Sequence, residues 1–386
     1  MGLRFSNRLP WDAPATTLSR AIQAHGDPEA DLTISNPTAV GFSYPEIVIR
    51  DALASAETLR YMPDSRGLQR AREAISEYHR NAVSSDEVVL TASTSEGYSW
   101  IFKLLCQAGD EILVPTPAYP LFECLAGLEG VHVRSYAMHY YDGWYIDTDR
   151  LGQLPTERTR AIVFVNPGNP TGSFLGLSEY ETMARLCHAT NMALICDEVF
   201  ADYPFQPLSA DFVPSVAGRA DVLTFVLSGL SKVCALPQMK LGWIAVKGPR
   251  EECDAALSRL DLIADTYLSV STPVQHAAAQ LLDVRRPMQQ QVLERVRANY
   301  RTLLSMTEGT GLRPLHVQGG WTAAVRVPPV RSEEDWVLHL LGHSGVLTQP
   351  GYFYDFQGGP FLVLSLLTPL QTFSEGLRRT ILACKG

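Results

Sequence analysis

Short apolar runs rich in β-branched residues alternate with stretches of helical periodicity through the middle of the chain. Continuous apolar runs are typical of strands buried on both faces, whereas apolar residues at helical spacing indicate amphipathic helices. The expected strands cover residues 88–91, 112–115, 131–136, 161–165, 193–196, 222–227 and 243–246, and the expected helices cover 96–108, 120–128 and 178–190. This alternation predicts an α/β fold with three layers, in which helices cover both faces of a mainly parallel, mixed sheet.

The pattern changes after Pro249. Two helical stretches are expected at 252–262 and 275–304, the second interrupted near 286–287, followed by strands at 322–327 and 361–366 and a helix at 372–383. The first 45 residues lack a core of their own and are expected to pack against this C-terminal part. We therefore predict a large domain of residues 46–280 and a smaller α+β domain built from both chain ends, residues 1–45 and 281–386.

Composition and charge weigh against several classes of protein. The 386 residues are 46% hydrophobic and 19% charged, so there is ample apolar material for a folded core. The formal net charge of -9 disfavours a nucleic-acid or anionic-membrane partner. The apolar runs 161–165 and 192–196 are far shorter than the roughly 20 residues of a bilayer span, and the N-terminus does not resemble a signal peptide. The seven cysteines form no CxxC motif, so we expect a cytoplasmic protein with neither a disulfide framework nor a metal site.

Two polar motifs follow predicted strands. Residues 166–172, Asn-Pro-Gly-Asn-Pro-Thr-Gly, come directly after the strand at 161–165, and their prolines and glycines predict a rigid turn. Asp197 follows the strand at 193–196, where a buried carboxylate needs a cationic or hydrogen-bonding partner. Open α/β sheets bind ligands at this edge. Each motif alone is also compatible with a structural role, as a plain connection or as a helix N-cap.

Lys232 and the segment 91–96 supply two further groups. Lys232 is one of only five lysines in the chain and follows the apolar run 222–227, so burial can lower its pKa and make its amine a nucleophile toward aldehydes. Within 91–96, Ser93 and Glu96 predict a capping box at a helix start, where backbone N–H groups and the helix dipole attract an anion such as phosphate. The alternatives are a surface lysine and an ordinary helix cap.

Together these groups match the requirements of pyridoxal 5'-phosphate. A lysine forms a Schiff base with its aldehyde, an aspartate keeps its ring nitrogen protonated, and a helix start holds its phosphate. Because the motifs follow one another on a single predicted sheet, we expect them to meet in one site.

The chain also resembles the fold-type I, class I/II aminotransferases that depend on pyridoxal phosphate, including the aspartate and alanine aminotransferases. The matching motifs run in the family's order along nearly the whole chain: Asn36-Pro37; Tyr61 followed by Gly67 and Arg72; residues 91–96; Pro117-Ala118-Tyr119-Pro120; residues 166–172; Asp197-Glu198; Ser231-Lys232; Gly319-Gly320; and Pro350-Gly351. The resemblance implies an enzyme that transfers an amino group from an amino acid to a 2-oxo acid through a Schiff base on Lys232.

The resemblance further implies a role for each matching residue. Lys232 is expected to hold the cofactor and to move the proton at the substrate α-carbon. Asp197 is expected to pair with the ring nitrogen, Asn169 to donate to the ring's 3' oxygen, and Tyr119 to stack on the ring. The residues expected at the phosphate are Thr94, Ser95, Ser231, Lys240 and, reaching from the neighbouring subunit of a homodimer, Tyr61.

Three positions depart from the family's pattern. Lys240 stands where an arginine usually holds the phosphate, so it supplies charge without the bidentate fork. Phe200 stands where a tyrosine usually donates to the 3' oxygen. Val363 stands where an arginine usually grips the substrate α-carboxylate, and valine offers no hydrogen bond. Either another group binds the carboxylate or the substrate presents none there; the candidate replacements are Arg4, Arg66 and Arg326.

Two other functions compete with transamination. A pyridoxal-phosphate-dependent lyase, such as a carbon–sulfur lyase, shares the fold and the cofactor motifs, and the sequence does not separate the two. A transcription regulator built on this fold would carry a basic helix-turn-helix domain ahead of the aminotransferase pattern, which begins by Asn36 here. The presence of Lys232, Asp197 and Asn169 argues against an inactive homologue.

Overall fold

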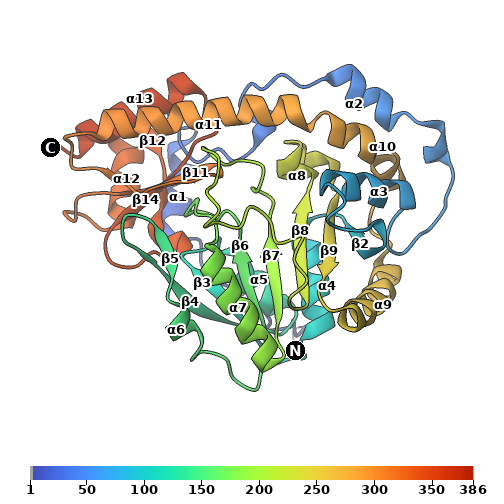
Figure 1. Cartoon of the computed structure of the whole chain (residues 1–386). Coiled ribbons are helices and arrows are strands. Elements are labelled where there is room, and N and C mark those ends of the chain that lie inside the picture. Colours follow the sequence, from blue (N-terminus) through green and yellow to red (C-terminus); the bar gives the residue numbers. More distant parts are fainter. Residues whose placement is uncertain (1–2, 386) are drawn as a thin grey trace.

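An eight-stranded mixed sheet is the largest element of the computed structural model, which describes residues 3–385 (Figure 1). In spatial order its strands are β2 (Val88–Thr91), β9 (Gly242–Lys247), β8 (Thr224–Gly229), β7 (Ala193–Asp197), β6 (Thr159–Val165), β3 (Glu111–Thr116), β4 (His132–Tyr140) and β5 (Trp144–Ile146). The five strands from β8 to β4 are parallel, while β9 runs antiparallel to both β8 and β2, and β5 runs antiparallel to β4. The prediction of a mainly parallel, mixed sheet is confirmed.

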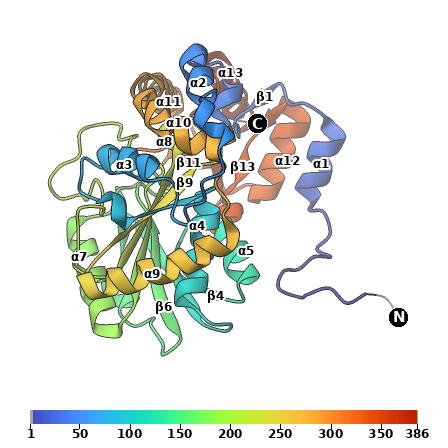
Figure 2. The same cartoon turned by 90° about the vertical axis from the view of Figure 1, so that its right-hand side faces the viewer.

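Helices cover both faces of this sheet and complete the three predicted layers (Figures 1 and 2). In β7, Leu194 and Cys196 join the core on one face, while Ala193 and Ile195 join the core on the other. The strand reads as continuously apolar because successive side chains enter different cores. The first core includes α3 (Gln69–Tyr78), α7 (Leu177–Thr190) and α10 (Thr272–Asp283), and the second includes α4 (Thr94–Leu105), α5 (Leu121–Leu128) and α9 (Arg250–Tyr267).

A second, antiparallel sheet and its helices form a third core from both ends of the chain. Leu18 and Leu32 pack in this core together with Val292 and Phe373, so the N-terminal segment lies against the C-terminal part, as expected. The domain boundaries themselves stay a prediction. The sheet has the order β10 (Arg313–Pro314), β11 (Thr322–Arg326), β14 (Phe361–Ser365) and β13 (Gln349–Pro350), and its neighbours are α1 (Thr17–His25), α11 (Arg285–Thr307), α12 (Glu333–Ser344), α13 (Leu370–Ala383) and the parallel pair β1 (Ala30–Asp31) and β12 (Val346–Leu347).

The end of α10 and the start of α11 follow from local chemistry. The helix at 275–304 is divided into α10 and α11 at Val284, just before the predicted interruption. Pro287 then falls in the first turn of α11, where its missing N–H removes no intrahelical hydrogen bond. Further short elements are α2 (Glu46–Leu53), α6 (Thr148–Leu151), α8 (Leu230–Val233) and the 3-10 helices η1 (Pro37–Ala39), η2 (Ala56–Leu59), η3 (Ser85–Glu87), η4 (Pro237–Met239) and η5 (Gly351–Tyr354). Within residues 3–385, no helix combines the length and apolar character that crossing a bilayer requires.

Candidate active site

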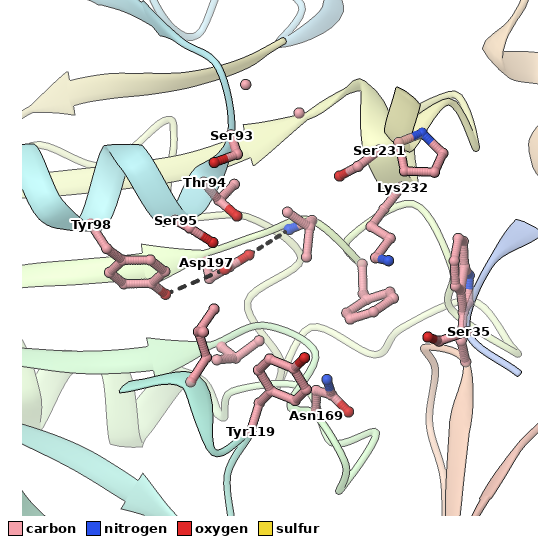
Figure 3. Close-up of a pocket in the computed structure, with 18 of the residues that line it drawn as sticks. Ser35, Ser93, Thr94, Ser95, Tyr98, Tyr119, Asn169, Asp197, Ser231 and Lys232 are labelled. Carbon is pink, nitrogen blue, oxygen red and sulfur yellow. Dashed lines mark hydrogen bonds between the residues drawn. The ribbon is translucent and has the colours of Figure 1, made fainter. Parts of the chain in front are cut away.

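A cavity of about 360 Å³ opens where the parallel strands β6, β7 and β8 end (Figure 3). Pockets of this volume suit small organic ligands, and this edge is where open α/β sheets bind them. Of the predicted site residues, the cavity brings together Thr94, Ser95, Tyr119, Asn169, Asp197, Ser231, Lys232 and Lys240. Tyr61 does not line it, and that side chain lies 78% exposed at another part of the surface.

Lys232 enters the cavity from the short helix α8, directly after β8. Its neighbours Leu230 and Val233 are fully buried and anchor this turn in the core. The Nζ atom lies 4.9 Å from the ring centroid of Trp321 and 5.8 Å from that of Phe200. Burial lowers the pKa of the Lys232 amine, and the charge of Asp197 only partly opposes this effect. A larger neutral fraction makes this amine the most suitable nucleophile in the cavity.

Asp197 is the last residue of β7, and its carboxylate has two donors. The backbone N–H of Val199 donates to Oδ1 over 3.0 Å, and the Tyr98 hydroxyl donates to Oδ2 over 3.3 Å (Figure 3). Burial raises the pKa of Asp197 to about 6, against the effects of these donors and of Lys232. The group is therefore mostly ionised at neutral pH and can accept a hydrogen bond from a protonated ring nitrogen.

The start of α4 forms one end of the cavity. Ser93 caps the helix by accepting from the N–H of Glu96 over 3.2 Å. The second half of the predicted capping box is wrong, because the Glu96 carboxylate accepts from the N–H of Ala92 over 2.6 Å and from the Ser269 hydroxyl over 2.7 Å. Glu96 thereby ties the helix start to the segment before α10.

Several donors converge on the space in front of this helix. Figure 3 shows the hydroxyl groups of Thr94, Ser95 and Ser231 directed toward the same space. Lys240 lines the same cavity from the residue that ends η4, where its φ of 52° lies in the left-handed region. None of these four side chains has a hydrogen-bond partner within the described residues 3–385. Hydroxyls, an ammonium group and a helix start are the donor set that a phosphate group requires.

The predicted turn at 166–172 positions one of its two asparagines toward the cavity. Asn166 is buried and structural, because its Nδ2 donates to the Val213 carbonyl over 2.8 Å and its Oδ1 accepts from the N–H of Leu175 over 3.0 Å. Asn169 lines the cavity instead, and its Oδ1 accepts from the Thr322 hydroxyl over 3.5 Å. With Oδ1 turned to Thr322, the amide nitrogen of Asn169 is the group that can donate into the cavity.

The residues near Val363 that line the cavity are Thr322, Gln349 and Tyr354, and we call them the neutral wall because none of them carries a charge. Val363 is 1% exposed and packs with Tyr354, Phe356 and Phe361 instead of lining the cavity. Tyr354 donates its hydroxyl to Gln349, and both residues line the cavity. None of the three arginines considered as replacements lines it: Arg326 donates to the Gly358 carbonyl, Arg66 donates to the Asp86 carbonyl, and Arg4 is exposed near the N-terminus. Within the described chain, the cationic side chains that line the cavity are those of Lys232 and Lys240.

Sequence reasoning missed several residues of the site. Tyr98 follows Thr94 by four positions on α4 and therefore faces the same side of the helix, a spacing that the sequence contains. Trp321, Gln349 and Tyr354 lie in the C-terminal part of the chain and reach the cavity only through the packing of the second sheet.

The fold and this cavity define a class of α/β enzymes whose ligand site lies at the carboxyl ends of parallel strands. The chain belongs to the aminotransferase class I and II family, which it matches over residues 30–365. The protein is therefore an aminotransferase, and this family uses pyridoxal phosphate.

Individual relatives agree with this assignment. The alanine aminotransferase of Mycobacterium tuberculosis is 27% identical over 370 residues, covering 93% of this chain and 86% of the relative. The glutamate-pyruvate aminotransferase of Haemophilus influenzae is 26% identical over 369 residues, covering 93% and 91%. The alanine aminotransferase from Pyrococcus furiosus superposes with a TM-score of 0.83 at 27% identity, covering 95% and 94% of the two chains. An aminotransferase from Escherichia coli shares the fold with a TM-score of 0.87 at 21% identity, covering 100% and 99%. These findings do not favour the lyase alternative.

Proposed function

We propose that this cavity binds pyridoxal 5'-phosphate and that the protein uses it to transfer an amino group from an amino acid to a 2-oxo acid. The convergence of a partly buried lysine of lowered pKa, a strand-end aspartate and a helix start on one cavity carries the proposal. When bound, the cofactor supplies an aldehyde that takes up the substrate amine and a ring that withdraws electrons from the α-carbon.

The residues of this chain supply positioning and proton transfer. Lys232 holds the cofactor and then, as an amine of lowered pKa, moves the proton at the substrate α-carbon. Asp197 holds a proton on the ring nitrogen, and Asn169 donates to the ring's 3' oxygen. Tyr119 covers one face of the ring. The side chains assigned to the phosphate are Thr94, Ser95, Ser231 and Lys240.

The names of the relatives support small amino acids as the first donors to examine. Relatives named alanine aminotransferase and glutamate-pyruvate aminotransferase each align with 93% of the chain. We therefore propose L-alanine and L-glutamate as initial donors and pyruvate as an initial acceptor. Because the neutral wall near Val363 offers no cation to the substrate carboxylate, the affinity for these donors is the quantity to measure.

A single half-reaction tests this function. Purified protein loaded with pyridoxal 5'-phosphate is mixed with a donor and no acceptor. An aminotransferase releases one equivalent of 2-oxo acid per site and keeps the amino group on the cofactor, which mass spectrometry of the extracted cofactor detects. Continuous release of ammonia and a 2-oxo acid from serine or cysteine without an acceptor would contradict the proposal and favour a lyase.

We also propose that the protein is a cytoplasmic homodimer in which Tyr61 reaches the phosphate held by the second copy. Tyr61 is 78% exposed, and its neighbours Leu59 and Met62 are 88% and 66% exposed, so this segment presents apolar surface that a partner can cover. Light scattering tests the dimer. The substitution Tyr61→Phe is expected to weaken cofactor binding without changing the mass in solution.

A further inference from the structure

Tyr98 is a buried residue of α4 whose hydroxyl donates to the carboxylate of Asp197. Its side chain is 3% exposed, and the hydroxyl donates to Oδ2 of Asp197 over 3.3 Å. The ring is held by Phe122 in an edge-to-face contact at 5.3 Å between centroids and by Phe102 at 5.9 Å. These contacts determine where the hydroxyl lies, because a tyrosine side chain has only two rotatable angles before its oxygen.

The position of Tyr98 on α4 links the two ends of the cavity. Tyr98 follows Thr94 by four residues and Ser95 by three, so all three side chains lie along one face of the helix. Four residues of helix advance about 6 Å, which separates the backbone of Thr94 from that of Tyr98 along the helix axis. A single rigid element therefore carries both groups.

The surroundings of Asp197 show what the Tyr98 hydroxyl adds. The carboxylate meets the N–H of Val199 on its own strand connection, the Tyr98 hydroxyl from α4, and the Lys232 ammonium at longer range. Glu198, the next residue, turns to the other side, where it accepts from the Ser215 hydroxyl and from the N–H of Val216. Removing Tyr98 leaves Oδ2 without its side-chain donor.

We propose that Tyr98 is a positioning residue that keeps the Asp197 carboxylate ionised and directed at the cofactor's ring nitrogen. Because α4 also carries Thr94 and Ser95, the same helix then fixes the position of the cofactor phosphate and, through Asp197, the position of the ring nitrogen. This inference rests on the proposed function, because it acts through the assignment of Asp197 to the ring nitrogen.

A purely structural tyrosine provides the comparison within this chain. Tyr180 on α7 is 1% exposed and donates its hydroxyl to the Asp221 carboxylate over 2.9 Å, but neither residue lines the cavity. Tyr180→Phe therefore removes a tyrosine–aspartate hydrogen bond of the same kind away from the site. It is the matched control for Tyr98→Phe.

The test is a double-mutant cycle read by cofactor affinity. The four proteins are the wild type, Tyr98→Phe, Asp197→Asn and the double variant, each titrated with pyridoxal 5'-phosphate. The 3.3 Å separation exceeds the usual 2.7–2.8 Å of hydroxyl donors, so we expect a weakening of about fivefold to tenfold for Tyr98→Phe. In the Asp197→Asn background the same substitution should change affinity less than about twofold, because coupled residues are not additive.

The pH dependence of cofactor binding provides a second measurement. If Tyr98 were merely structural, Tyr98→Phe would not change it. Burial raises the pKa of Asp197 and the Tyr98 hydroxyl lowers it, so Tyr98→Phe should move the loss of cofactor on acidification to higher pH. Tyr180→Phe should leave both the affinity and this pH limb unchanged.

The outcomes are separable. Equal weakening by Tyr98→Phe in both backgrounds, or none in either, overturns the role of Tyr98 while the assignment of Asp197 stands. An Asp197→Asn variant with unchanged cofactor affinity overturns the assignment of Asp197 in the proposed function, and the role of Tyr98 with it.

Discussion

Replacing Lys240 by methionine tests the phosphate end of the site most directly. Lys240 lines the same cavity as the start of α4, yet its side chain is exposed. A hydrogen bond to a charged partner contributes about 1.5–3 kcal/mol, and solvent screening places an exposed lysine at the lower limit. We therefore expect Lys240→Met to weaken pyridoxal 5'-phosphate binding about tenfold, which corresponds to about 1.4 kcal/mol.

The assay combines affinity with stability. Cofactor binding stabilises the folded protein in proportion to the logarithm of concentration over Kd, so a tenfold weaker Kd removes about 1.4 kcal/mol of this stabilisation at saturating cofactor. Lys240→Met should reduce the thermal shift produced by the cofactor and leave the cofactor-free midpoint unchanged. Lys240→Arg keeps the charge and adds a bidentate fork, so it should bind the cofactor at least as tightly as the wild type.

Lys247→Met is the matched control. Lys247 ends β9 and pairs with Glu87 at 2.9 Å on a partly buried surface away from the cavity. Its loss leaves Glu87 without its partner, so the cofactor-free protein should lose stability while the Kd for the cofactor stays the same. An unchanged Kd in Lys240→Met, or an equal change in both variants, would show that the Lys240 ammonium does not hold the cofactor phosphate.

Three further predictions concern the lysine, the substrate wall and the pH dependence of stability. Lys232→Ala should abolish the cofactor adduct trapped by borohydride, and peptide mapping that finds the adduct on Lys240 would contradict the assignment. Val363→Arg places a charge in a site that is 1% exposed, so it should cost more than about 2 kcal/mol of stability by thermal melting and lower the KM for L-alanine; an unchanged KM means that carboxylate binding lies elsewhere. Burial lowers the pKa of His79 from 6.5 to about 4, and its Nε2 accepts from the Trp243 indole over 3.0 Å. Because the unfolded chain protonates first, the free energy of unfolding should fall by about 3 kcal/mol as pH drops from 6.5 to 4, and His79→Gln should remove this loss in urea titrations.

The lysine, the aspartate and the helix start that line this cavity could be predicted from the sequence, because each lies next to a strand end. Asp197 closes β7, Lys232 follows β8 by three residues, and Ser93 starts α4 two residues after β2. A short apolar run followed by a polar turn thus predicts both the strand and the place of the polar side chains that line the cavity.

The burial of certain polar residues could not be predicted from the sequence. In α3, the buried face includes Arg72 and Ser76 beside Ala71 and Ile75. The Arg72 guanidinium is satisfied by the Gly67 carbonyl at 2.8 Å and the Ser85 carbonyl at 3.0 Å. A buried arginine that donates to backbone carbonyls looks like a surface position in the sequence, so residue type alone could not place Arg72 in the core.

The substrate end depends on contacts between segments far apart in sequence. The N–H of Ala118 donates to the Tyr354 carbonyl over 3.0 Å, which joins the loop carrying Tyr119 to η5. The side chain of Gln318 likewise accepts from the N–H of Phe174 over 2.8 Å. No local pattern encodes these pairings, so the residues that the C-terminal part contributes to the cavity could not be assigned from the sequence.

The neutral wall sets a quantitative limit on how this enzyme can bind a carboxylate. A hydrogen bond to a neutral donor contributes about 0.5–1.5 kcal/mol, against about 1.5–3 kcal/mol with a charged one. Gln349 and Thr322 are neutral groups lining the cavity near Val363. Two such bonds in place of an arginine pair lower the affinity by about 2 kcal/mol, or roughly thirtyfold. Simple amino acids should therefore bind weakly in the wild type, and a tight-binding donor must gain its affinity from contacts beyond the α-carboxylate.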